Sequence, residues 1–267
     1  MEKVAIFGAP RSGTSWLGQI FNSSPHVAYR FQPLFSYTFK GRITLNSKPK
    51  DIEQFYDDLF VTKDEFVLQK KNISGEKGLA FRKEILTHLV WKEVRYHYLI
   101  EHLMANSSTK VIGLVRHPCA VINSWLQAPK EFDSAWDPLE EWRYASKKNQ
   151  NMPEEYNGYE KWKELVFLYM KLEEKYPERF KIQVYERLNE DTEEEVKKLF
   201  NFINLSLERQ ILSFILESKS EDSRDPYGVH RKEQDNNKWK KGLLTEIQNS
   251  IFNDIDFIEI NHRFQWN

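Results

Sequence analysis

The sequence contains very little cysteine and no strong excess of charge. Cys119 is the only cysteine among 267 residues, so a disulfide framework is excluded and a reducing, cytoplasmic location is expected. The formal net charge is −1, which gives no overall field that would draw the protein to nucleic acid or to an anionic membrane. An anionic ligand would therefore have to be held by a local group of donors.

Long apolar runs and metal-ligand patterns are also missing. No run approaches the roughly 20 apolar residues that span a bilayer, so membrane insertion is not expected. The first predicted strand begins at about Val4, which leaves no room for a signal peptide. Paired cysteines, His-x-x-x-His spacing and Asp-rich calcium loops are absent from the sequence, so we expect no metal site.

Short apolar runs alternate with helical patterns along the chain. We predict strands at 3–7, 26–31, 78–84, 109–115 and 180–185, helices at 16–21, 52–59, 98–104, 193–203 and 207–216, and mainly helical structure over 120–176. Strands that alternate with helices favour an α/β fold, with a parallel sheet covered by helices on both faces. No repeat or linker divides the chain, so one domain over residues 1–267 is expected.

The strongest functional signal is the loop GAPRSGTS, which begins at Gly8. Gly8 and Gly13 bracket a turn between a predicted strand and helix, where backbone N–H groups and the helix N-terminus can bind a tetrahedral anion. Thr14 and Ser15 add two hydroxyl donors. The spacing matches a Walker A loop, but Thr14 stands at the lysine position and Arg11 is the loop's only cation. Such a loop is poorly suited to a nucleoside triphosphate with Mg²⁺.

A second candidate anion site follows the predicted strand 109–115. Arg116 stands at its carboxyl end, Pro118 opens a helix, and Ser124 lies about two turns along that helix. Ligands of open α/β sheets collect at the carboxyl ends of strands, so we expect Arg116 near the first loop. Its planar guanidinium suits bidentate phosphate binding, although an arginine–carboxylate pair is an equal alternative for this residue alone.

These segments resemble the family of sulfotransferases that use 3′-phosphoadenosine-5′-phosphosulfate (PAPS). GAPRSGTSWL at 8–17 is similar to the family's 5′-phosphosulfate loop, and VIGLVRHPCAVINSW at 111–125 resembles its 3′-phosphate motif. QIFNSSPHV at 19–27 is similar to the carbohydrate sulfotransferase branch. The resemblance, which runs from about residue 3 to 247, implies the sulfotransferase fold: a P-loop-like parallel sheet flanked by helices, with a helical region on the acceptor side.

The resemblance also implies which residues contact PAPS and its product, adenosine 3′,5′-bisphosphate. These are Arg11, Ser12, Gly13, Thr14, Ser15 and Trp16 in the first loop, Arg116 and Ser124 in the second motif, Tyr185 in VYERL, and Arg231 and Lys232 in a late basic loop. Core packing is an equal alternative for Trp16 and Tyr185, and a solvated charge cluster for the late loop. In VYERL, Arg187 replaces the family's usual aspartate.

The general base is where the sequence departs from the family. Carbohydrate sulfotransferases often have a glutamate before a proline after the second strand, but Gln32 stands here, and an amide cannot take the proton. Gln32 is expected to orient the acceptor. Cytosolic relatives have a lysine followed two positions later by histidine. The segment RKE at 82–84 can be aligned with this pair in two ways. In one alignment Lys83 matches the lysine. In the other, Arg82 matches the lysine and Glu84 stands at the position of the base. We expect Glu84 to be the base, with His88 as the alternative.

The sequence therefore predicts an enzyme that moves a sulfuryl group from PAPS to a hydroxyl acceptor by metal-independent in-line transfer. Arg11 and the loop amides would stabilise charge on the leaving phosphate. A carbohydrate acceptor is expected from the resemblance at 19–34, and an aromatic or lipid-like alcohol is the alternative. Two other functions stay open: a P-loop kinase-like phosphotransferase, and a protein that binds adenosine bisphosphate without catalysis.

Overall fold

The computed structural model describes residues 1–70, 79–220, 228–230 and 235–266. Within these residues a five-stranded parallel sheet forms the centre of the molecule, in the order β2-β3-β1-β4-β5. Its strands are β1 (Glu2–Gly8), β2 (Val27–Phe31), β3 (His88–Glu93), β4 (Lys110–Val115) and β5 (Phe180–Val184). The predicted α/β fold with a parallel sheet is confirmed.

The strands are apolar on both sides because helices cover both faces of the sheet. In β1, Ala5 and Phe7 belong to one buried cluster, whereas Val4 and Ile6 belong to the other. Successive side chains of a strand point to opposite faces, so one short run contributes to two cores. Because β1 pairs with β3 on one side and β4 on the other, the segments that follow these three strands emerge next to one another.

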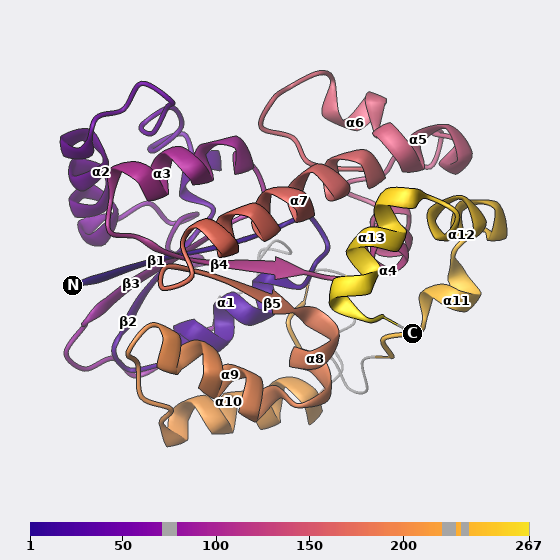
Figure 1. Ribbon diagram of the computed structural model, residues 1–267. Coiled ribbons are helices and arrows are strands. Elements are labelled where there is room, and N and C mark those ends of the chain that lie inside the picture. Colours follow the sequence, from indigo (N-terminus) through magenta and orange to yellow (C-terminus); the bar gives the residue numbers. More distant parts are fainter. Residues whose placement is uncertain (71–78, 221–227, 231–234, 267) are drawn as a thin grey trace.

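The helices form two layers and a further group at one end of the sheet (Figure 1). One face is covered by α2 (Pro49–Val61), α3 (Ile100–Asn106) and α7 (Tyr159–Lys175), and the other by α1 (Thr14–Asn22), α8 (Tyr185–Glu190), α9 (Thr192–Phe202) and α10 (Arg209–Ser220). Beyond the carboxyl ends of the strands lie α4 (Pro118–Leu126), α5 (Pro138–Tyr144), α6 (Ser146–Asn149), α11 (Trp239–Gly242), α12 (Thr245–Phe252) and α13 (Ile255–Phe264). Two 3₁₀ turns, η1 (Pro33–Phe35) and η2 (His97–Leu99), follow β2 and precede α3.

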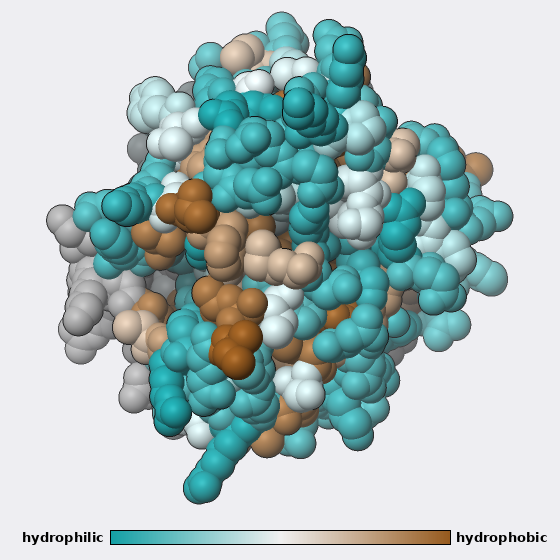
Figure 2. Space-filling model, turned by 90° about the vertical axis from the view of Figure 1, so that its left-hand side faces the viewer, coloured by the Kyte–Doolittle hydropathy of each residue, from teal (hydrophilic) through white to brown (hydrophobic). Residues whose placement is uncertain are grey.

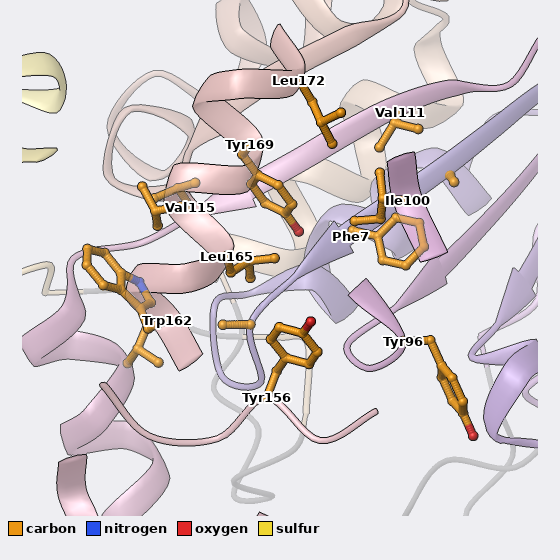
Figure 3. Close-up of a cluster of buried hydrophobic side chains, with 14 of the residues drawn as sticks. Phe7, Tyr96, Ile100, Val111, Val115, Tyr156, Trp162, Leu165, Tyr169 and Leu172 are labelled. Carbon is orange, nitrogen blue, oxygen red and sulfur yellow. The ribbon is translucent and has the colours of Figure 1, made fainter. Parts of the chain in front are cut away.

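Helix α7 packs closely onto the centre of the sheet. Figure 3 shows Tyr169 and Leu172 of α7 among the buried side chains that surround Phe7. A Cβ atom on Gly113 of β4 would lie 2.6 Å from the ring of Tyr169. Only glycine permits so close an approach, so residue 113 sets the distance between the helix and the sheet.

The end of the molecule at which the strands begin presents a largely hydrophilic face, with a broken hydrophobic area near its middle (Figure 2). Among the described residues, no helix combines the length and the apolar character needed to cross a bilayer. The candidate site lies at the opposite end, where the strands finish.

One predicted strand is wrong. The structure has no strand over the described residues 79–84, where the side chains of Arg82 and Glu84 are exposed, and β3 begins at His88 instead. The physical reason is burial, because all six residues of β3 are buried between β1 and β2, as a central parallel strand must be. The other four strands lie within one residue of their predicted bounds.

Arg30 of β2 fastens the carboxyl end of α2 to the sheet. Its guanidinium donates hydrogen bonds to the backbone carbonyls of Leu59 (2.7 Å), Phe60 and Tyr29 (2.8 Å). The last carbonyls of a helix have no partner within the helix, and a cation there also complements the helix dipole. Burial lowers the pKa of Arg30 to about 10, which still leaves it charged at neutral pH.

We therefore expect Arg30→Met to destabilise the protein. The substitution leaves buried carbonyls without a donor, and each such group costs about 1–3 kcal/mol. Urea unfolding at pH 7 measures the free energy of unfolding. The matched control is Arg42→Met, which removes an exposed ion pair with Asp58 and should cost less than about 1 kcal/mol. Equal losses in the two variants would contradict the role of Arg30.

Candidate functional site at the carboxyl edge of the sheet

A cavity of about 860 Å³ lies where the carboxyl ends of the strands meet the group of helices beyond them. Residues at or after the ends of all five strands line it. The loop after β1 contributes Arg11, Gly13, Thr14, Ser15 and Trp16, and the end of β2 contributes Phe31 and Gln32. The end of β3 contributes Lys92 and Arg95, the segment after β4 contributes Arg116, Asn123 and Ser124, and the segment after β5 contributes Tyr185 and Asn189. Parallel α/β sheets bind their ligands at this edge.

The loop between β1 and α1 makes a close turn at Gly13. This residue has a φ of 95°, and a Cβ atom on it would lie 2.5 Å from the ring of Tyr185. Both the backbone conformation and the contact require glycine. Within the described part of the chain, no side chain caps the N-terminus of α1. Its first N–H groups therefore remain for an anion, together with the hydroxyls of Thr14 and Ser15.

Arg11 and Arg116, expected to approach each other, meet in this cavity. Arg11 Nε donates a hydrogen bond to Ser124 Oγ (3.2 Å), and an Nη1 group of Arg116 donates to the backbone carbonyl of Arg11 (3.1 Å). The Arg116 guanidinium also lies 4.3 Å from the ring centroid of Tyr185. Two guanidinium groups and a helix N-terminus thus share one hollow, which suits a ligand with two anionic groups.

Two buried donors beside this hollow have no hydrogen-bond partner among the described residues: Arg116 Nε and Ser12 Oγ. Buried polar groups are nearly always paired, so Arg116 Nε, whose residue lines the cavity, indicates a position at which a ligand could bind. Ser12 itself is not among the residues that line the cavity. Trp16 lines it, and its Nε1 donates to Ser218 Oγ (3.0 Å) while its ring lies edge-on to Tyr185.

Glu186 and His117 hold the Arg116 segment in place. Glu186 Oε1 accepts a hydrogen bond from the backbone N–H of His117 (3.0 Å), and its Oε2 accepts one from Trp266 Nε1 (2.8 Å). The His117 ring stacks on Trp239, with ring centroids 4.6 Å apart. Burial lowers the pKa of His117 to about 3, so this ring is neutral and packs as an aromatic group. Residues near the carboxyl end of the described chain therefore support the arginine.

A lysine that sequence reasoning missed enters the cavity from the end of β3. Lys92 is 1% exposed, and its Nζ lies 3.3 Å from Ser15 Oγ and 3.5 Å from Thr14 Oγ1. Burial lowers the pKa of Lys92 to about 8, although the adjacent Glu93 carboxylate opposes the shift. The signal was present in the sequence, because HLVW is a strand-like run that ends directly before this lysine.

Lys83 and Glu84, expected near the reacting groups, lie outside the residues that line the cavity. They precede β3 and therefore lie toward the edge at which the parallel strands begin, where Glu2 pairs with His88. Glu84 is exposed and pairs with Arg82 (3.3 Å). These positions do not fit the expectation that Glu84 is the base, because its carboxylate lies in an exposed ion pair outside the cavity lining.

The two other residues considered around β3 have structural partners. The Lys83 Nζ donates to the backbone carbonyls of Asn22 and Ser24 (3.0 Å), at the end of α1. His88 is buried at the start of β3, with its Nε2 2.9 Å from the carbonyl oxygen of Ile203. Burial lowers the pKa of His88. Neither residue lines the cavity.

Gln32 lines the cavity directly after β2, with its backbone N–H bonded to the carbonyl of Lys92 (2.9 Å). Beside it, the rings of Phe31 and Phe35 both lie against Phe66, with centroids 5.4 and 5.9 Å apart. These rings form an apolar part of the lining that touches its cations, because Lys92 Nζ lies 4.5 Å from the Phe31 ring centroid and the Arg95 guanidinium 4.3 Å from that of Phe35. Arg231 and Lys232, expected over a phosphate group, lie outside the described residues.

Solved structures of sulfotransferases resemble this fold. The sulfotransferase domain of the Synechococcus PCC 7002 olefin synthase has a TM-score of 0.57 and 16% identity, over 100% of this chain and 95% of that one. A mouse sulfotransferase complexed with PAP has a TM-score of 0.54 and 14% identity, over 99% of this chain and 88% of that one. The sulfotransferase domain from the curacin biosynthetic pathway has a TM-score of 0.53 and 16% identity, over 100% of this chain and 98% of that one. These identities establish similarity of fold alone.

Comparison with curated proteins finds no match. The sequence model of the sulfotransferase domain, in contrast, matches residues 1–255, which is nearly the whole chain and includes every strand and the cavity-lining loops described above. The chain therefore belongs to the sulfotransferase family.

Proposed function

We propose that this sulfotransferase takes its sulfuryl group from PAPS and transfers it to a hydroxyl group of a carbohydrate. The observation that carries the proposal is the meeting of Arg11 and Arg116 in one cavity, beside the N-terminus of α1. PAPS carries anionic groups at both ends of its ribose, and two separate cationic groups are what such a nucleotide needs. The solved mouse sulfotransferase was complexed with PAP, which supports the same class of donor here.

The proposal assigns each part of the donor to a part of the cavity. The phosphosulfate would bind the N-terminus of α1, with Arg11, Lys92, Thr14 and Ser15 as donors. The 3′-phosphate would bind Arg116, whose buried Nε lacks a partner among the described residues, with Ser124 beside it. Trp16 and Tyr185 are proposed to contact the adenine. Arg231 and Lys232 remain part of the proposal for the 3′-phosphate.

The proposed chemistry is an in-line displacement at sulfur. The acceptor oxygen forms a bond to sulfur while the bond from sulfur to the 5′-phosphate oxygen breaks, and negative charge grows on that leaving oxygen. Fixed donors directed at such charge are each worth about 3–4 kcal/mol in a site that excludes water. Arg11, Lys92 and the α1 N-terminus would supply them, so the proposed transfer needs no metal ion.

The carbohydrate acceptor rests on the resemblance at 19–34 and on the cavity's mixed lining. Phe31, Phe35 and Phe66 offer rings for the apolar CH faces of a sugar, and the amides of Asn123 and Gln127 line the same cavity. The three phenylalanines also favour the second candidate, an aromatic or lipid-like alcohol.

A cytoplasmic location is proposed too, since the one cysteine, Cys119, is a buried free thiol.

Transfer of ³⁵S from labelled PAPS tests the function directly. We expect label on a hydroxylated acceptor when a mixture of glycans and a mixture of phenolic and aliphatic alcohols are supplied in parallel, without added divalent metal and with a chelator present. Label in the glycan arm supports the carbohydrate, and label only in the other arm contradicts it. Tight PAPS binding with no transfer in either arm would indicate a non-catalytic nucleotide-binding protein. Phosphate release from ATP with Mg²⁺ would indicate a phosphotransferase.

Substitution of Arg116 tests the assignment of the 3′-phosphate. We expect Arg116→Met to weaken binding of adenosine 3′,5′-bisphosphate by at least about tenfold, because a charge-assisted hydrogen bond is worth about 1.5–3 kcal/mol. Binding of adenosine 5′-phosphate, which lacks the 3′ group, should change less than threefold. Titration calorimetry measures both affinities. A similar loss for both nucleotides would show that Arg116 does not distinguish the 3′-phosphate.

The lowered pKa of Lys92 predicts a pH dependence of donor-site binding. Lys92 is charged below about pH 8 and neutral above it, so affinity for adenosine 3′,5′-bisphosphate should fall as the pH rises from 7 to 9.5. In Lys92→Met the affinity should be weaker at pH 7 and nearly constant over this range. Lys70→Met, which alters an exposed lysine paired with Glu65, should behave like the wild type. Parallel curves for wild type and Lys92→Met would contradict the assignment.

A further inference from the structure

Glu131 stands at the junction of two hollows. It lines the 860 Å³ cavity and also a second hollow of about 450 Å³, which is formed by the segment 129–136 and Lys148. Lys130 and Lys148 line both hollows as well. The two hollows therefore adjoin at these three residues, so a second molecule in the smaller hollow would lie close to a donor bound in the larger one.

The fold holds Glu131 firmly at this position. Its backbone N–H donates to the carbonyl of Ala128 (2.9 Å), in the turn that ends α4, the helix that also carries Ser124. The next residue, Phe132, packs edge-on against Trp125 and Trp136, with centroids 5.2 and 5.5 Å apart. This aromatic cluster anchors the segment, so the position of the carboxylate does not depend on a free surface loop.

The carboxylate lies against the proposed phosphosulfate-binding arginine. Glu131 Oε1 is 3.5 Å from Arg11 Nη1, and the same guanidinium bonds Ser124. The side chain of Glu131 is 25% exposed, and its charge also acts on Lys92. Asp235 is the other carboxylate among the described residues that line the cavity, and its Oδ1 accepts a hydrogen bond from the backbone N–H of Asn237 (2.8 Å). Glu131 is thus the acid beside the proposed reaction centre.

We infer that Glu131 is the general base of the transfer, and that the acceptor enters through the second hollow. The inference rests on the proposed function. As the acceptor oxygen bonds to sulfur, its proton passes to the Glu131 carboxylate. The bond from sulfur to the 5′-phosphate oxygen breaks, and its electron pair stays on that oxygen, which faces Arg11 and Lys92. This assignment supplies the acid–base group that Gln32 cannot provide.

A purely supporting role for Glu131 gives a different expectation. If Glu131 only held Arg11 in position, its loss would weaken nucleotide binding and leave the pH dependence of the transfer unchanged. If it accepts the proton, its loss lowers kcat while nucleotide affinity stays the same or increases, because a negative charge next to the anion has been removed. The two roles are therefore separated by measuring binding and turnover on the same variants.

The test uses Glu131→Gln, Glu131→Asp and the control Glu140→Gln in the full chain, with ³⁵S-labelled PAPS and an acceptor that the wild type uses. Glu140 is an exposed partner of Lys147, far more accessible than Glu131, so its variant controls for loss of an ion-paired carboxylate. We expect Glu131→Gln to lower kcat by about 10²- to 10⁴-fold. The acid limb of the kcat–pH profile should vanish, while the affinity for adenosine 3′,5′-bisphosphate should change less than threefold. Glu131→Asp should retain that limb with a smaller loss.

Each other outcome overturns the inference in a recognisable way. Wild-type kcat in Glu131→Gln removes Glu131 from the proton transfer, although the proposed function stands. Loss of nucleotide affinity in step with kcat reassigns Glu131 to positioning Arg11. A wild-type protein that binds PAPS but labels no acceptor overturns the proposed function itself, and with it the role of Glu131. Circular dichroism of each variant confirms that the losses are not those of unfolded protein.

Discussion

The site depends on the contact between the loop that follows β1 and the residues that follow β4 and β5. Tyr185 lies against the Cα of Gly13 on one side and beneath the Arg116 guanidinium on another. Arg116 in turn bonds the carbonyl of Arg11. Three segments far apart in the sequence are locked together by these contacts, and a side chain at residue 13 would separate them. The spacing of the two arginines follows from this packing.

Charge is concentrated in the cavity although the chain is nearly neutral. The net charge is −1, yet Arg11, Lys92, Arg95 and Arg116 all line one hollow. Like charges brought together repel, and burial adds a desolvation cost that the lowered pKa of Lys92 makes visible. Nearby carboxylates and the face of Tyr185 offset part of this cost. A bound anion would offset the remaining repulsion between these cations, so the arrangement favours binding of an anionic ligand.

Much of the fold and part of the site could be predicted from the sequence, because the informative patterns are local. The strand before Gly8 and the strand before Arg116 are short apolar runs followed directly by the candidate site residues, so their composition and length locate both. The apolar start of GLAFRKE resembles a strand, so the sequence predicts Lys83 near the reacting groups, whereas β3 ends with Lys92 in the cavity. Glu131 carries no local signal. Its nearness to Arg11 arises from the packing of α4 against the sheet, which no spacing in the sequence encodes.

The hydrogen bond from Trp266 to Glu186 has a consequence for how the protein is made. Glu186 also accepts a hydrogen bond from the backbone N–H of His117, the neighbour of Arg116. Trp266 therefore completes the set of contacts that support Arg116. Strands β1 to β5 leave the ribosome well before Trp266 does. During synthesis the sheet can therefore assemble before Trp266 completes the hydrogen bonds of Glu186 that support the Arg116 segment.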